Sequence, residues 1–72
     1  MVTLYSKPSC VQCTATSKAL NNAGISYRYV DVTTDDEALE TVKSLGYMAA
    51  PVVVTEDTHW SGFRPDLIAT LS

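Results

Sequence analysis

The two cysteines of this chain, Cys10 and Cys13, are separated by two residues. They follow a β-like run at residues 2–5, and a segment of helical character begins near Val11. Cysteines three positions apart in a first helical turn share one face, so their sulfurs can close and reopen a small disulfide ring. The free N–H groups and partial positive charge of a helix N-terminus stabilise a thiolate at Cys10. The pair therefore predicts a thiol–disulfide redox centre.

The place of each cysteine in the helix predicts its role. Cys10 lies at the terminus and is expected to attack, whereas Cys13 lies one turn inside and is expected to resolve the mixed disulfide. A thiol pKa near ~7 instead of ~8.5 raises the thiolate fraction at neutral pH to about half. Since nucleophilicity falls with basicity, the net gain in rate is only about threefold. The larger advantage is expected from the proximity of Cys13 to the mixed disulfide.

Other uses of the pair have to be weighed against redox chemistry. A permanent disulfide is one, and a metal site is another. A structural zinc site takes four nitrogen or sulfur ligands, and this chain has two cysteines and a single histidine, His59. A complete zinc site within the chain is therefore disfavoured, while an iron–sulfur cluster shared between two subunits through Cys10 stays as an alternative. His59 is interpreted as a surface residue of a hairpin rather than a catalytic group.

Length and charge limit the functional classes. A chain of 72 residues is expected to form one domain over residues 1–72, with a monomer as the default state. A net charge of −3 without a basic run argues against nucleic acid and anionic membranes as partners. The apolar stretches are too short to span a bilayer, and the first residues do not form a signal peptide. Two cysteines without an export signal predict a cytoplasmic protein. In that reducing compartment such a pair is expected to alternate between dithiol and disulfide.

The first half of the chain predicts two strands with a helix between them. Residues 2–6 form the first strand. The helix that follows has a small-residue face of Ala15, Ala19 and Ala23 beside Leu20, and Gly24 is expected to cap its end. Residues 27–32 form the second strand.

The second half predicts a helix, a hairpin and a last helix. Thr34 and Glu37 have the spacing of a capping box, and the helix they open presents Ala38, Val42 and Leu45 before Gly46. Residues 51–55 and 58–60 form a hairpin joined through Glu-Asp, although this is not a favoured turn pair. The last helix starts at Pro65, with three apolar residues inward: Leu67, Ile68 and Leu71. The order βαβαββα predicts an α/β protein of thioredoxin-like fold, with a four-stranded mixed sheet flanked by three helices.

Several residues outside the cysteine pair are candidates for the site, each with a purely structural alternative. Lys7 adds positive potential near the thiolate or is simply solvated. Pro51 is either an ordinary proline at a strand start or a cis proline whose turn leaves the preceding backbone free for an extended substrate. The aromatic residues of segment 60–65, Trp60 and Phe63, fit either core packing or a protein-docking patch.

Three segments together resemble the NrdH-redoxins, which are small glutaredoxin-like proteins with thioredoxin-like activity. They are residues 7–13 (Lys-Pro-Ser-Cys-Val-Gln-Cys), 50–53 (Ala-Pro-Val-Val) and 60–65 (Trp-Ser-Gly-Phe-Arg-Pro). The resemblance covers essentially the whole chain. It implies a thioredoxin fold, with Cys10 as nucleophile, Cys13 as resolving cysteine and Pro51 as a cis proline beside them. In that family the 60–65 segment lies near the redox site. We therefore predict a partner-binding surface of the following residues: Lys7, Val11, Gln12, Ala50, Pro51, Trp60, Ser61, Gly62, Phe63 and Arg64.

The resemblance also implies the partners. It implies reduction by thioredoxin reductase, with electrons from NADPH and no bound cofactor. The implied acceptor is the disulfide of the class Ib ribonucleotide reductase large subunit, so that the protein would support deoxyribonucleotide synthesis.

A glutathione-dependent glutaredoxin is the other redox alternative. Glutaredoxins proper hold glutathione with a Thr-Val pair before the cis proline and with a Gly-Cys-Asp-Asp-like stretch. Here those positions carry Ala49-Ala50 and residues 62–65 (Gly-Phe-Arg-Pro). Each lost charge-assisted hydrogen bond costs about 1.5–3 kcal/mol, so glutathione is expected to be a poor reductant.

Overall fold

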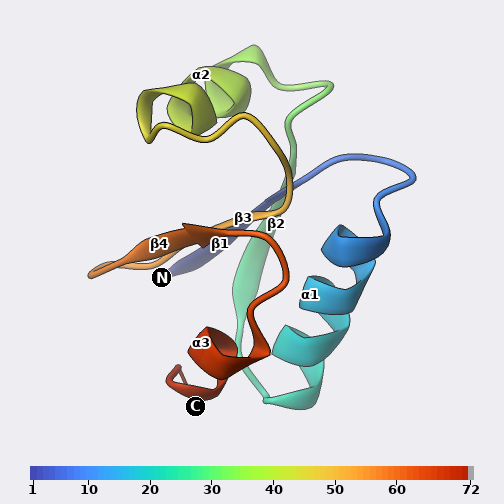
Figure 1. The fold of residues 1–72 in the computed structure, drawn as a ribbon, viewed down its shortest axis with the longest axis vertical. Coiled ribbons are helices and arrows are strands. Elements are labelled where there is room, and N and C mark those ends of the chain that lie inside the picture. The colour runs from blue at the N-terminus through green and yellow to red at the C-terminus, as the bar shows by residue number, and fades with distance from the viewer. Residues whose placement is uncertain (72) are drawn as a thin grey trace.

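The predicted order of strands and helices is confirmed by a computed structural model, which describes residues 1–71 (Figure 1). No helix within that range is long and apolar enough to cross a membrane. The elements along the chain are β1 (Val2–Ser6), α1 (Val11–Asn22), β2 (Tyr27–Asp31), α2 (Asp36–Ser44), β3 (Val52–Val54), β4 (His59–Ser61) and α3 (Pro65–Ala69).

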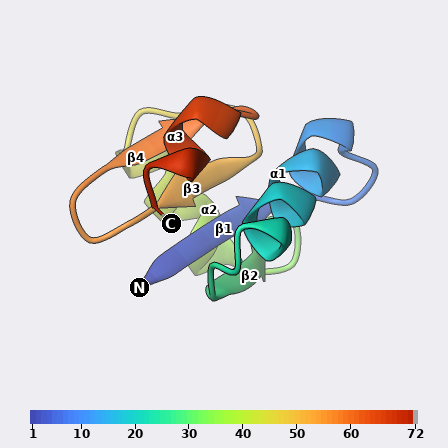
Figure 2. The same cartoon turned by 90° about the horizontal axis from the view of Figure 1, so that it is seen from below.

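The strands form one mixed sheet in the order β2-β1-β3-β4. β1 pairs with β2 in parallel through the α1 crossover, and with β3 in antiparallel. β3 and β4 form the expected antiparallel hairpin. Helices α1 and α3 cover one face of the sheet and α2 covers the other, as Figures 1 and 2 show from two directions. The predicted mixed sheet flanked by three helices is therefore present.

The main core lies between the sheet and the layer of α1 and α3. It is built from buried side chains of the sheet and of both helices: Leu4, Leu20, Val53, Trp60 and Ile68. Burying one such aliphatic side chain contributes about 1.5–3 kcal/mol. The core thus joins the cysteine-bearing helix to the central strands.

Helix α1 faces the sheet partly through the expected residues, since Leu20 is buried in the core and Ala19 packs against it. Its buried side chains are Cys13, Thr16 and Leu20, which follow the i, i+3, i+7 spacing of one helix face. Ala23 is exposed at the C-cap, so the predicted alanine face is wrong at its end. Gly24 ends the helix as predicted, with φ at +71° and the Ile25 N–H bonded to the Leu20 carbonyl at 3.0 Å.

Helix α2 does not begin with the predicted capping box. Asp35 is the N-cap, and its carboxylate accepts a hydrogen bond of 3.0 Å from the Ala38 N–H. The Thr34 hydroxyl instead donates to the Asp31 carbonyl at 3.3 Å, within a turn where the Asp31 carboxylate also binds the Thr33 N–H. Thr34 is therefore engaged in the preceding turn, and the stronger acceptor Asp35 takes its place.

The hairpin turn explains how an unfavourable Glu-Asp pair is accommodated. The Thr55 hydroxyl accepts hydrogen bonds from the N–H groups of Asp57 and Thr58, and the Thr55 N–H donates to the Thr58 carbonyl at 2.8 Å. The hydrogen bonds of the Thr55 side chain thus stabilise a turn whose Glu-Asp pair does not itself favour the turn geometry. Pro65 is the first residue of α3, as predicted, and Ile68 is buried.

Candidate redox site

Cys10 and Cys13 form a disulfide at the N-terminus of α1, with a Cα–Cα distance of 5.2 Å. Cys10 is the N-cap residue, and its Sγ accepts a hydrogen bond of 3.1 Å from the Cys13 N–H. Cys10 is half-buried, whereas Cys13 is only 3% exposed. After reduction the same N–H and the helix terminus favour a thiolate on Cys10 over one on Cys13. The geometry therefore suits attack by Cys10 and resolution by Cys13.

The start of β3 lies directly beside the disulfide. The Ala50–Pro51 peptide bond is cis, as the resemblance implied. The Ala50 carbonyl oxygen lies 3.9 Å from the Cys10 Sγ, although the two residues are 40 positions apart in the sequence. Pro51 is buried and Ala50 is half-buried. Ala50 and Pro51 are thus placed next to the reacting sulfur.

The segment after β4 forms a third side of the site. The Gly62 N–H donates a hydrogen bond of 2.8 Å to the Pro51 carbonyl, and Ser61 pairs with Val52 across the hairpin. A Cβ at Gly62 would lie 3.7 Å from the Gln12 Oε1. Gln12, Pro51 and Gly62 come from three separate segments of the chain, and the fold brings all three to the redox pair.

Exposed apolar side chains occur in each of these segments or next to them. Val11 is 85% exposed, Phe63 is 39% exposed, and Met48 is 93% exposed in the stretch leading to Ala50. Exposed apolar surface around a reactive group is typical of a protein-docking surface. Sequence reasoning missed Met48, although a methionine two residues before the Ala-Pro step was a visible signal.

Trp60 and Arg64 are placed differently from the other candidates. Trp60 is 5% exposed and belongs to the core. Of the two predictions for Trp60, core packing is therefore the one that the structure supports. The Trp60 Nε1 has no hydrogen-bond partner among residues 1–71. Arg64 is exposed and donates to the Asp66 carboxylate from Nε at 3.2 Å and Nη2 at 3.0 Å. These hydrogen bonds lower the pKa of Asp66.

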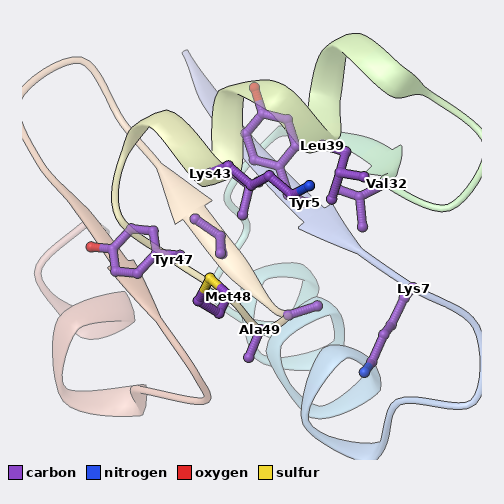
Figure 3. A pocket seen from close by; sticks show the side chains of 11 residues that line it. Tyr5, Lys7, Val32, Leu39, Lys43, Tyr47, Met48 and Ala49 are labelled. Carbon is purple, nitrogen blue, oxygen red and sulfur yellow. The ribbon is translucent and has the colours of Figure 1, made fainter.

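An apolar pocket of about 200 Å³ lies between α2 and the sheet and reaches the site through Ala50. Figure 3 shows its lining side chains from α2, the sheet and the segment that leads from α2 to β3. Exposed Lys7 also lines this pocket. Tyr47, another lining residue, bonds through its hydroxyl to the Nδ1 of His59 at 2.7 Å. His59 is therefore an exposed hairpin residue with a tyrosine partner, as the interpretation of it as a surface residue expects.

A second hollow lies against the cysteines themselves and is lined by Cys10, Cys13 and Tyr29 among others. Tyr29 comes from β2, and sequence reasoning did not single it out. In the part of the chain that the structure describes, no three side chains of His, Cys, Asp or Glu gather as metal ligands.

Known proteins resemble this chain in sequence over nearly its full length. A family model described as Glutaredoxin matches residues 2–60. The Glutaredoxin-like protein NrdH of Escherichia coli (strain K12) is 41% identical over 70 residues, covering 97% of this chain and 86% of that protein. The NrdH protein of Lactococcus lactis subsp. cremoris (strain MG1363) is 39% identical over the full length of both chains.

Solved structures agree with the sequence relatives. NrdH-redoxin from Escherichia coli, described as glutaredoxin-like with a thioredoxin-like activity profile, superposes with a TM-score of 0.94 at 41% identity. The match covers 99% of this chain and 93% of that one. The thioredoxin-like protein BC3987 superposes with a TM-score of 0.90 at 22% identity over the full length of both chains, which supports the fold alone. The predicted thioredoxin-like fold is confirmed.

Proposed function

This chain belongs to the glutaredoxin family, among its NrdH-like members, and we propose that it is a dithiol–disulfide electron carrier for protein disulfides. The observation that carries the proposal is the asymmetry of the cysteine pair. Cys10 is a half-buried N-cap whose sulfur accepts a backbone N–H, whereas Cys13 is almost fully buried one turn away. This arrangement suits an attacking thiolate backed by a resolving thiol.

The reaction has two exchange steps. In the reduced protein the Cys10 thiolate attacks one sulfur of the target disulfide, so that a Cys10–target bond forms and the target S–S bond breaks. The released target sulfur leaves as a thiolate and takes a proton from solvent. The Cys13 thiol then loses its proton and attacks the Cys10 Sγ. This closes the Cys10–Cys13 disulfide and frees the second target thiol, so two electrons have passed to the target.

The backbone beside Cys10 has a role in holding the target. The Ala50 carbonyl, 3.9 Å from the Cys10 Sγ, is an acceptor for an N–H of an extended target segment. Exposed Val11, Met48 and Phe63 then cover apolar surface of the partner around the reacting sulfurs. We place Lys7 and Gln12 at the same interface, since Lys7 lines both hollows next to the site and Gln12 adjoins Gly62.

The proposed electron source is thioredoxin reductase with NADPH, and the proposed acceptor is the disulfide of a class Ib ribonucleotide reductase large subunit. Two observations support this. The NrdH-redoxin of Escherichia coli has a thioredoxin-like activity profile, and this chain superposes on it over nearly its full length. The positions at which glutaredoxins proper bind glutathione carry Ala49, Ala50 and the Gly-Phe-Arg-Pro stretch instead. No cofactor bound by this chain is needed for the exchange, and a cytosolic setting suits the cycle.

The test is to follow NADPH oxidation with the purified protein and a protein disulfide as acceptor. One reaction contains thioredoxin reductase, and the other contains glutathione and glutathione reductase. Turnover with thioredoxin reductase and little with glutathione is expected, and the oxidised ribonucleotide reductase large subunit is the next acceptor to supply. Turnover only with glutathione would instead assign the chain to the glutathione-dependent glutaredoxins, in line with the family model.

A further inference from the structure

The hollow beside the disulfide is the place where the resolving cysteine meets solvent. It has a volume of about 320 Å³, and both Cys10 and Cys13 line it. The apolar pocket beneath α2 reaches neither sulfur. A hollow of this size, lined by the hydroxyl-bearing residues Ser9, Thr14 and Tyr29, has room and polar partners for water. Access to Cys13, which is otherwise almost fully buried, therefore comes from this side.

Tyr29 projects from β2 to line the same hollow. The side chain is 55% exposed, yet its hydroxyl is held in place by a hydrogen bond of 3.0 Å that it donates to the Ser6 Oγ. Ser6 is completely buried at the end of β1, immediately before the loop that carries the cysteines. The Tyr29 hydroxyl is thus held by the paired strands β1 and β2, and Tyr29 lines the hollow that Cys13 also lines.

In the second exchange step the Cys13 thiol has to lose its proton, and that proton has to leave through the hollow. Cys13 must lose its thiol proton before it attacks, and burial in apolar surroundings opposes that loss. The helix N-terminus and the Cys13 N–H stabilise negative charge on the Cys10 sulfur and not on that of Cys13. Among the described residues that line the hollow there is no carboxylate and no histidine, and Lys7 and Tyr29 are the titratable side chains besides the cysteines. On α3, which packs against α1, Asp66 is exposed and bonded to Arg64.

We propose that Tyr29 is a positioning residue for the resolving step, because its hydroxyl, held by Ser6, binds the water that takes the proton from Cys13. The proton passes from the Cys13 thiol to that water and out to solvent. The Cys13 thiolate then attacks the Cys10 Sγ, the new disulfide forms, and the target sulfur leaves as a thiolate. Tyr29 neither gains nor loses electrons and acts through the water. This inference rests on the proposed dithiol mechanism.

Dithiobis(nitrobenzoate) separates the two exchange steps in one stopped-flow experiment. Attack by Cys10 on this disulfide releases a first coloured thiolate, and attack by Cys13 on the mixed disulfide releases a second. Tyr29→Phe keeps the ring and removes the hydroxyl. It is expected to slow the second release about three- to tenfold at neutral pH, the size of one lost hydrogen bond. The pH at which the second release is half-maximal should rise, while the first release stays unchanged. Ser6→Ala should give a smaller change in the same direction.

The matched control is Tyr27→Phe. Tyr27 lies on the same strand, and its hydroxyl is also bonded to a serine, Ser17 at 2.5 Å, but it does not line the hollow. This variant should leave both releases and the pH midpoint unchanged. A Tyr29→Phe protein with an unaltered second release, or one in which both releases slow alike, would overturn the role of Tyr29. A wild-type protein without a second release would overturn the dithiol mechanism itself.

Discussion

The backbone N–H of Gly62 donates a hydrogen bond of 2.8 Å to the carbonyl oxygen of Pro51. This bond ties the end of β4 to the residue that precedes β3, one residue from the Ala50 carbonyl that lies against the Cys10 sulfur. It continues the hairpin, in which Ser61 pairs with Val52. The segment before β3 and the segment after β4 therefore form one structural unit at the redox site.

Gly62→Ala should disturb this unit through the backbone. Gly62 has φ at +85°, where a Cβ costs about 1–2 kcal/mol, and the added Cβ would make only an ordinary contact of 3.7 Å with the Gln12 Oε1. The free energy of unfolding in urea should fall by about that amount, and kcat/KM with thioredoxin reductase should fall with it.

Gly24→Ala is the control for that experiment. Gly24 has φ at +71° at the far end of α1, with open space around the position of a Cβ. The Gly24→Ala variant should lose a similar free energy of unfolding, while its kcat/KM with thioredoxin reductase stays that of the wild type. Equal activity losses in the two variants would contradict a local role of Gly62 at the redox site.

The exposure of the two cysteines predicts which single variant traps a partner. Cys13→Ser keeps the accessible N-cap sulfur of Cys10 and should accumulate a mixed disulfide with an oxidised target. Cys10→Ser leaves only the buried Cys13 thiol and should form little of it. Non-reducing electrophoresis and intact mass measure the product. Trapping by Cys10→Ser alone would reverse the assigned roles.

Trp60 should behave as a core residue rather than a binding residue. Trp60→Ala removes a buried aromatic side chain and should lower the free energy of unfolding by about 3–5 kcal/mol. Trp60→Phe should lose clearly less, since phenylalanine also removes the Nε1 donor that has no partner among the described residues. The KM of folded Trp60→Phe for thioredoxin reductase should match that of the wild type, and a raised KM at unchanged stability would instead place Trp60 at the interface.

Met48 should contribute to docking without contributing to stability. Its side chain is 93% exposed, so Met48→Gln should leave the urea midpoint unchanged. If the partner covers part of this side chain, KM for thioredoxin reductase should rise about three- to tenfold, since partial covering contributes less than the about 1.5–3 kcal/mol of full burial. An unchanged KM would exclude Met48 from the docking surface.

The Arg64–Asp66 pair predicts a measurable titration difference. Hydrogen bonds from Arg64 lower the pKa of Asp66, so Arg64→Gln should return that pKa towards its ordinary value, about 3.9. Because the folded-state pKa is the lower one, the stabilisation is present above the unfolded-state pKa and is lost as the pH falls through the folded value. Both side chains are exposed, so the effect on unfolding should be small and should weaken with salt. NMR titration of the Asp66 carboxyl carbon measures the shift, and identical pKa values in the two proteins would contradict it.

Local patterns in the sequence were enough to predict the elements and the reactive pair. The Cys10–Cys13 spacing, the helix-ending Gly24 and Gly46 and the helix-starting Pro65 act over a few residues, so their effects can be read along the chain. The capping box and the Ala23 end of the alanine face were exceptions. At the capping box, a local choice between Thr34 and Asp35 was decided by the turn at Asp31, which engages the threonine hydroxyl.

Tertiary structure decided how distant residues share the site. Strand pairing brings Ala50 and Gly62 to the end of α1, and packing between the sheet and its helices buries Trp60 while it leaves Met48 in solvent. The placement of Tyr29 in the wall of the hollow that Cys13 also lines depends on the parallel pairing of β1 with β2 and on the hydroxyl of Ser6. None of these relations follows from residue spacing, because each depends on which faces of the sheet and helices meet when apolar side chains leave water.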